Sequence, residues 1–112
     1  MLIYKIFRAN EWASLQANGS TQGAPVDLAD GFVHFSTAEQ VRETAAKHFA
    51  GEDGLILLAC DAEALGEDLK WEPSRGGALF PHLYRELRLD DVKWHRPLPL
   101  APGGHDFPEA LT

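Results

Sequence analysis

The chain has 112 residues, of which 45% are hydrophobic, and its 17 acidic and 10 basic side chains give a formal net charge of −7. This length and composition fit one globular domain and exclude low-complexity disorder for most of the chain. The acidic balance disfavours a nucleic-acid binder, which needs a basic stripe, and no apolar stretch approaches the roughly 20 residues of a membrane span.

The first predicted element is a strand over residues 2–7, which are mostly β-branched or aromatic. This start lacks the basic segment and the long apolar segment of a signal peptide, so we expect a cytoplasmic location. Asn10 can cap a short helix that ends at Asn18-Gly19. Residues 20–30 are mainly small and polar and are predicted to form a loop.

A strand-to-helix junction is predicted next. Residues 31–35 are typical of a strand. Ser36 and Glu39 have the spacing of a capping box, which predicts that a helix begins at this point. Val41 and Ala45 follow at helical spacing, and Gly51 ends the helix.

The second half is predicted to consist mostly of short strands. The apolar run 55–60 indicates a strand covered on both faces, with Cys60 as a small buried hydrophobic residue. The later segments are a helical turn at 61–65, a strand at 69–72, a turn at 73–77, mixed turn and strand at 79–89, and a strand at 92–96. The order predicts one α+β domain over residues 1–97, followed by a proline- and glycine-rich tail over 98–112.

His34 is the first candidate for chemistry. It ends the predicted strand beside a helix N-terminus, which attracts anions, and alternation places Phe32 on the same face. A ligand-contacting histidine and a half-buried histidine bonded to the backbone both fit this position. Ser36 points to the same side, and its role as a helix cap is compatible with ligand contact.

The second group of candidates surrounds His82. His82 and Tyr84 follow Pro81 and offer an acid–base group and a ring for stacking, or they complete the core. Glu72 ends a predicted strand, where a carboxylate is either catalytic or solvated. Arg75 begins a glycine-containing loop that either closes over a ligand or is only a turn.

Several other chemistries lack their motifs. The histidines show no zinc-ligand spacing and there is no Cys-x-x-Cys pair, so we expect no dedicated metal site. The Gly-x-Ser-x-Gly elbow of many hydrolases and the glycine-rich phosphate-binding motifs are also absent.

Three motifs in order resemble those of the bacterial family called domain of unknown function 952. They are the segments 30–40, 71–73 and 80–84, with the sequences DGFVHFSTAEQ, WEP and FPHLY. The resemblance covers nearly the whole chain up to about Pro97. It implies a fold similar to the ADP-ribosyltransferase superfamily, especially the branch of the RNA 2′-phosphotransferases.

The resemblance also implies roles for individual residues. His34 would hold the ribose of NAD with support from Ser36, while His82 and Tyr84 would line the nicotinamide side. Glu72 is the candidate for the catalytic carboxylate, and Arg75 for cofactor binding. Relatives that process RNA need several arginines for phosphates, and only three positions here fit that need, namely Arg42, Arg75 and Arg85.

Two hypotheses of different classes follow. The first is an NAD-dependent, ADP-ribosyltransferase-like enzyme that uses His34, His82 and Glu72. The second is a non-enzymatic module that binds a small ligand or a peptide in the same cleft, because a catalytic carboxylate is not aligned and arginines are scarce. A purely structural partner protein is a third and more distant interpretation.

Overall fold

The computed structural model describes residues 1–109 and residue 111, apart from the side chain of Arg75. The strands are β1 (Leu2–Phe7), β2 (Ser20–Thr21), β3 (Val33–His34), β4 (Leu55–Asp61), β5 (Leu69–Pro73), β6 (Leu79–Leu83), β7 (Leu87–Arg88), β8 (Val92–Leu98), β9 (Leu100–Ala101) and β10 (Gly104–His105). The helices are α1 (Ala9–Asn18), α2 (Pro25–Asp30), α3 (Val41–His48) and α4 (Ala62–Leu65), with 3₁₀ turns at Gly66–Asp68, Arg75–Gly77 and Leu89–Asp91. The α+β class predicted from the sequence is confirmed.

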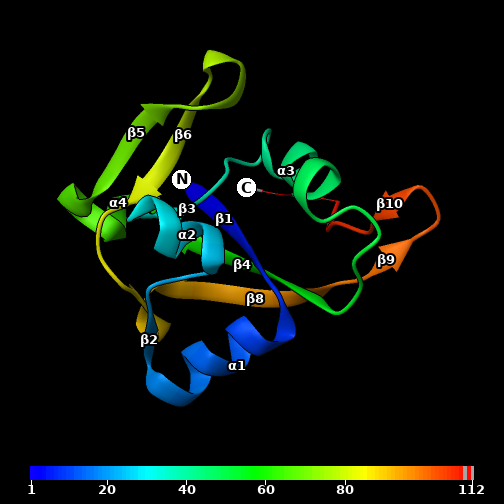
Figure 1. The fold of residues 1–112 in the computed structure, drawn as a ribbon, viewed down its shortest axis with the longest axis horizontal. Helices are drawn as coiled ribbons and strands as arrows, with labels where there is room; N and C mark the ends of the chain where they lie inside the picture. The colour runs from blue at the N-terminus through cyan, green and yellow to red at the C-terminus, as the bar shows by residue number, and fades with distance from the viewer. Residues whose placement is uncertain (110, 112) are drawn as a thin grey trace.

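The central sheet has the strand order β1-β4-β8 and is antiparallel throughout (Figure 1). Its middle strand β4 is apolar on both faces because successive side chains enter different cores. Leu58 and Cys60 pack in one core, while Leu57 and Ala59 pack in the other. Burial raises the pKa of the Cys60 thiol to about 12, so Cys60 is a packing residue as predicted.

Helices cover both faces of the central sheet. Trp12 and Leu15 of α1 belong to the first core, which also receives side chains from the smaller sheet. Val41 and Ala45 of α3 belong to the second core, and Phe107 of the C-terminal segment packs against it. Among the described residues, no helix is long and apolar enough to cross a membrane.

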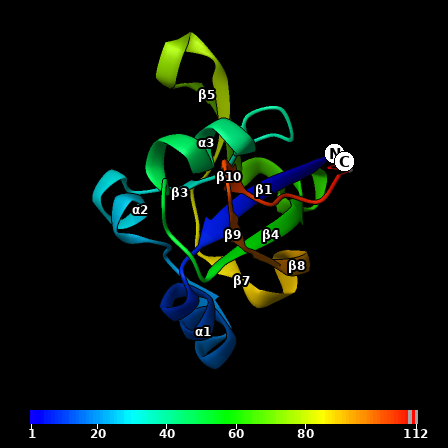
Figure 2. The ribbon, with the colours of Figure 1, turned by 90° about the vertical axis from the view of Figure 1, so that its right-hand side faces the viewer.

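A second antiparallel sheet has the order β3-β6-β5, and its β5–β6 hairpin projects from the body of the protein (Figures 1 and 2). The chain links the two sheets directly after β3. Phe35 donates its N–H to the carbonyl of Pro81 in β6, and Ser36 exchanges two backbone hydrogen bonds with Tyr4 in β1. The segment 33–36 therefore lies between the sheets and is bonded to both.

Three local predictions were wrong. Asn10 does not cap the first helix, because α1 begins at Ala9 with Arg8 at the cap position. The predicted loop 20–30 contains β2 and the helix α2, where Pro25 supplies the first helical residue. The predicted cap at Ser36 is absent, because its hydroxyl bonds the Thr44 hydroxyl at 2.9 Å and α3 begins later, at Val41. Instead, Gln40 accepts a hydrogen bond from the backbone N–H of Thr37 at 3.0 Å.

Candidate functional site

The two candidate histidines are direct neighbours across the smaller sheet. His34 of β3 pairs with His82 of β6, and their ring centroids are 5.3 Å apart. Strand alternation places Phe32 on the same face, where it stacks on His82 at 4.2 Å. Strand pairing therefore gathers residues far apart in the sequence into one aromatic and basic cluster.

His82 is oriented by Glu72, a residue of the neighbouring strand β5. The ring Nδ1 lies 2.7 Å from Glu72 Oε1, and the Tyr84 hydroxyl donates to the same oxygen at 2.7 Å. A carboxylate only accepts hydrogen bonds, so this contact places a proton on Nδ1 of His82. His82 is 4% exposed, and its other nitrogen, Nε2, has no hydrogen-bond partner among the described residues.

The hydrogen bonds to Glu72 alter the pKa of Glu72 itself and of Tyr84. Hydrogen bonds from Tyr84 and then His82 stabilise the ionised carboxylate and hold the pKa of Glu72 below its usual value. The same carboxylate raises the pKa of the Tyr84 hydroxyl, because it accepts a hydrogen bond from the phenolic O–H and so stabilises the protonated form. Glu72 is therefore an anion at neutral pH that fixes the orientation of the His82 ring.

The variant Tyr84→Phe is expected to raise the pKa of Glu72, because the ionised carboxylate loses its strongest hydrogen-bond donor. A carbon-13 NMR titration of the side-chain carboxyl groups measures this shift. Glu67, which is exposed, serves as the internal control in the same spectra. An unchanged Glu72 titration would show that the Tyr84 hydroxyl does not bond Glu72 in solution.

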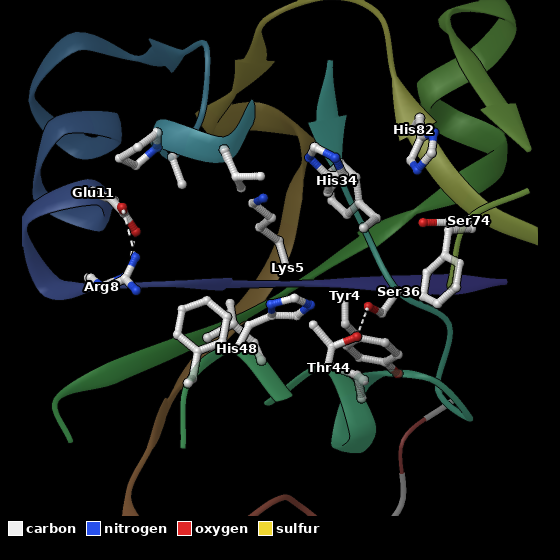
Figure 3. A pocket seen from close by; sticks show the side chains of 18 of the residues that line it. Tyr4, Lys5, Arg8, Glu11, His34, Ser36, Thr44, His48, Ser74 and His82 are labelled. Atoms are coloured by element: carbon white, nitrogen blue, oxygen red, sulfur yellow. Dashed lines mark hydrogen bonds and ion pairs between the residues drawn. The ribbon is translucent and has the colours of Figure 1, made fainter. Parts of the chain in front are cut away.

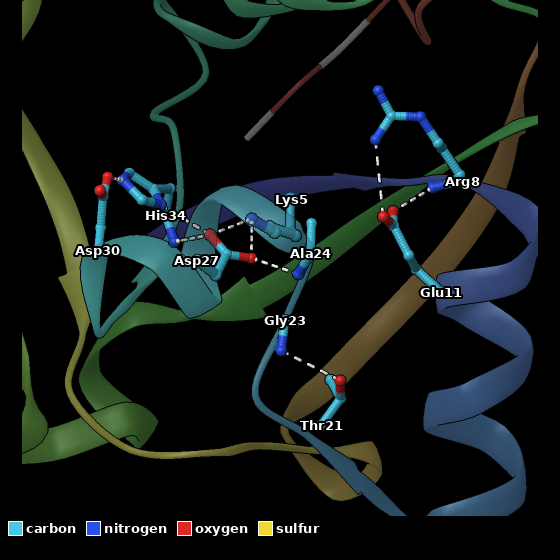
Figure 4. Close-up of polar contacts among 9 residues, drawn as sticks. All are labelled: Lys5, Arg8, Glu11, Thr21, Gly23, Ala24, Asp27, Asp30 and His34. Atoms are coloured by element: carbon cyan, nitrogen blue, oxygen red, sulfur yellow. Dashed lines mark hydrogen bonds and ion pairs between the residues drawn. The ribbon is translucent and has the colours of Figure 1, made fainter.

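His34 is held by a second set of charged residues (Figure 4). Its Nδ1 lies 2.6 Å from Asp27 Oδ1 and its Nε2 lies 2.9 Å from Asp30 Oδ2. Both contacts are hydrogen bonds only when each ring nitrogen carries a proton, since carboxylates do not donate. The His34 backbone N–H also donates to Asp27 Oδ1 at 2.9 Å.

Asp27 is the centre of this set and is 1% exposed. Lys5 of β1 donates to it at 2.8 Å and 3.0 Å, and the N–H of Ala24 donates at 2.7 Å. Burial opposes the charge on Asp27, but the bond from His34 and the charge of Lys5 outweigh it and lower the pKa of Asp27. Burial lowers the pKa of Lys5, and Asp27 opposes that shift.

A cavity of about 760 Å³ opens between the two sheets and α3, with His34 and His82 at one end (Figure 3). Ile6, Phe35 and Val41 contribute to its apolar walls. The polar and charged side chains that line it are Tyr4, Lys5, Arg8, Asn10, Glu11, His34, Ser36, Thr44, His48, Ser74 and His82. Its volume lies within the range of about 300–1,000 Å³ that is usual for small-molecule sites.

The structure divides the predicted site residues into two groups. His34, Ser36 and His82 line the cavity, whereas Glu72 and Tyr84 lie behind His82 and do not. The side chain of Arg75 lies outside the described part of the structure. Across the described residues, no group of three or more His, Cys, Asp or Glu side chains is arranged to hold a metal ion.

Sequence reasoning missed Asp27 and Lys5. Asp27 lies in the segment interpreted as a loop, although Pro25 followed by an acidic residue is typical of a first helical turn. Lys5 lies in a strand of apolar residues, and it is buried against α2. Because residues 20–30 were interpreted as a loop, this burial was not expected from the sequence. The helix-starting pattern at Pro25 is the signal that predicts α2 and the position of Asp27, the partner of Lys5.

The comparisons with known proteins show the family of the chain. Residues 6–95 match the family model DUF952, described as a protein of unknown function. The chain belongs to the DUF952 family. The matched range contains four residues of the site, namely His34, His82, Glu72 and Asp27. Lys5 lies directly before this range.

Solved structures of a protein from Caulobacter crescentus are also similar to this chain. The crystal structure of CC0527 from Caulobacter crescentus is 55% identical, covers 94% of this chain and 92% of its own, and has a TM-score of 0.90. The solution NMR structure of CC0527 is 56% identical, with 93% and 90% coverage and a TM-score of 0.83. A search of curated proteins found no match.

Proposed function

We propose that this DUF952 protein binds a ribose-bearing small molecule in the cavity between the sheets, with His34 and His82 in contact with the ligand. The observation that carries the proposal is the His82 ring, which is 4% exposed and lines the cavity with Nε2 unpartnered. Leaving a buried polar atom unpaired costs about 1–3 kcal/mol, so a partner supplied by a ligand hydroxyl would recover that cost.

The arrangement around His82 suits proton transfer. Glu72 holds the proton on Nδ1, which leaves the lone pair of Nε2 to accept a proton from a hydroxyl. Phe32 stacks on the ring and His34 lies beside it, so the base is fixed in position. The pair of Glu72 and His82 thus has the geometry of an oriented general base.

The finer form of the proposal is transfer of ADP-ribose from NAD, supported by the resemblance of the family to the ADP-ribosyltransferase superfamily. In that reaction the bond between ribose and nicotinamide breaks, and nicotinamide leaves with the bonding electron pair. An acceptor hydroxyl then bonds to the ribose carbon, and its proton passes to Nε2 of His82. His34 would hold the ribose during both events.

The variants His34→Ala and His82→Ala test this proposal. Each is expected to reduce release of nicotinamide from NAD by about 10²-fold or more, which is the usual contribution of a general acid or base. Chromatography of nicotinamide measures the rate, and circular dichroism verifies the fold. His95→Ala is the matched control, since His95 does not line the cavity. Full turnover in both site variants would disprove the enzymatic proposal.

A non-enzymatic binding module is the second candidate, and the position of Glu72 favours it. Both His82 and Tyr84 bond the same Glu72 oxygen, and Glu72 does not line the cavity, so no ligand atom meets this carboxylate directly. This candidate would be favoured if the wild-type protein bound a ribose-bearing compound saturably and released no nicotinamide or other base from it with any acceptor tested.

A further inference from the structure

The two lysine and arginine side chains that line the cavity in the described part of the structure, Lys5 and Arg8, are already paired with carboxylates. Arg8 donates to both oxygens of Glu52, at 2.8 Å and 3.0 Å, and its guanidinium lies 3.6 Å from Glu11. It also lies over the ring of Phe49 at 4.9 Å, which fixes its plane. A two-point contact of this kind is the same contact that arginine makes with a phosphate, so Arg8 is occupied for that purpose.

Lys5, the other cationic side chain of the cavity wall, is occupied as well. Its ammonium lies 2.8 Å and 3.0 Å from the two oxygens of Asp27, inside the protein. Moving Lys5 to a ligand phosphate would break its buried ion pair with Asp27, which would keep only the bonds from His34 and Ala24. Breaking a buried pair costs several kcal/mol, on the order of 3–5. Lys5 therefore neutralises Asp27 and is not available to a ligand.

Two backbone N–H groups that precede helices beside the cavity are bonded by side chains of the protein. A helix N-terminus binds anions through its free N–H groups. At α1 the N–H of Arg8 donates to Glu11 at 2.7 Å, and before α3 the N–H of Thr37 donates to Gln40 at 3.0 Å. A phosphate approaching the start of α1 from the cavity would therefore meet the Glu11 carboxylate, which lines the cavity there.

Carboxylates outnumber cations around the cavity and the residues that contact its wall. The carboxylates are Glu11, Asp27, Asp30, Glu52 and Glu72. The described cationic side chains are Lys5, Arg8, the more distant Lys70 and, when both of its ring nitrogens carry a proton, His34. Such an excess repels anions and attracts neutral or positive groups. The overall charge of −7 acts in the same direction.

We infer that the ligand of this cavity carries no phosphate and is an uncharged or positively charged nucleoside rather than a dinucleotide. This inference rests on the broad form of the proposed function, the binding of a ribose-bearing compound, and names the class of compound that the site selects. It argues against the finer form, transfer from NAD, because NAD contains a pyrophosphate. The apolar walls would receive the base, and Nε2 of His82 would meet a ribose hydroxyl. The ring nitrogens of His34 are bonded to Asp27 and Asp30, so His34 would contact the ribose through its ring. The ion pairs of Arg8 and Lys5 cause this preference for compounds without phosphate, because they engage the N–H donors that would otherwise bind a pyrophosphate.

The first test compares four probes by calorimetric and NMR titration of the wild-type protein. Adenosine and nicotinamide riboside lack phosphate, and the second carries a positive charge, whereas ADP-ribose and NAD contain a pyrophosphate. We expect at least one nucleoside to bind 10-fold or more tightly than either pyrophosphate compound, with amide shifts at His34 and His82. We expect the gap to narrow in 0.5 M salt, because salt screens the repulsion.

The outcomes separate the two proposals. Tighter binding of NAD or ADP-ribose than of both nucleosides would overturn this inference and leave the proposed function standing. An absence of binding by all four probes at millimolar concentration would overturn the proposed function, and this inference with it.

A second test releases Arg8 from its partners. In the double variant Glu11→Gln/Glu52→Gln the guanidinium loses both carboxylates. We expect affinity for ADP-ribose to rise about 10-fold, while affinity for adenosine changes less than 2-fold. The matched control is Glu39→Gln/Glu67→Gln, which removes the same charge at exposed positions that do not line the cavity. Equal gains in both double variants would show that total charge, and not Arg8, sets the preference.

Discussion

The variant Asp27→Asn is expected to lower the free energy of unfolding by about 3–5 kcal/mol, because it leaves Lys5 as a buried charge without its partner. Lys5 is 6% exposed and has both of its close contacts with Asp27. Asparagine has nearly the same shape, so the loss reports on charge rather than on packing. Urea unfolding followed by circular dichroism measures the change.

Two controls accompany Asp27→Asn. Asp30→Asn removes an exposed partner of His34, with a side chain that is 48% exposed, and should cost about 0–1 kcal/mol. The double variant Lys5→Met/Asp27→Asn also removes the charge of Lys5 and should recover most of the lost free energy of unfolding. A double-mutant cycle measures this recovery. A loss below about 1 kcal/mol for Asp27→Asn would mean that water reaches Lys5.

The free energy of unfolding of Asp27→Asn is also expected to depend on pH and to rise as the pH rises. Burial already lowers the pKa of Lys5, and loss of the opposing carboxylate lowers it further. The unfolded chain then binds more protons than the folded one at alkaline pH, so stability rises with pH up to the ordinary lysine value of about 10.4. Unfolding curves at pH 7 and pH 9.5 test this trend.

The variant Gly23→Ala is expected to lower the free energy of unfolding by about 2–5 kcal/mol. Gly23 has φ of +105°, and a Cβ at this position would lie 2.2 Å from Asp27 Oδ2. The positive φ costs about 1–2 kcal/mol in an L-residue, and overpacking against an immobile neighbour adds about 1–3 kcal/mol. Asp27 is immobile because Lys5, Ala24 and His34 all bond it.

Gly31→Ala is the matched control for Gly23→Ala. Gly31 has φ of +85°, but no atom lies within 4 Å of an added Cβ, so only the backbone cost of about 1–2 kcal/mol remains. A chemical denaturation series measures both variants, and the amide resonance of His34 reports displacement of Asp27. Equal losses in the two variants would contradict the predicted clash with Asp27.

Much of the fold could be predicted because local pattern and final environment agree. The apolar segments that became β1 and β4 are apolar on both faces, which is the pattern that a covered strand requires. The helix α3 shows apolar residues at helical spacing, with Val41 and Ala45 buried. In these elements the nearest residues in sequence carry enough information to fix the structure.

The candidate site could be predicted only in part. His34 and His82 stand out because each is flanked by aromatic residues, but their pairing depends on the register of β3 against β6, which no local pattern gives. The roles of Asp27 and Lys5 arise from tertiary packing of α2 on β1. Glu72 was identified as a site carboxylate, yet its position behind His82 follows from the β5–β6 register alone.

The strand order of the central sheet has a consequence for folding kinetics. β4 pairs with β1 through Ile3 and Cys60, and with β8 through Leu55 and Leu98, which closes loops of roughly 60 and 40 residues. The β5–β6 hairpin that carries His82 closes a much shorter loop. Because distant pairings form slowly, the hairpin can assemble before the central sheet, and the cavity, which needs both, is completed only in the last steps of folding.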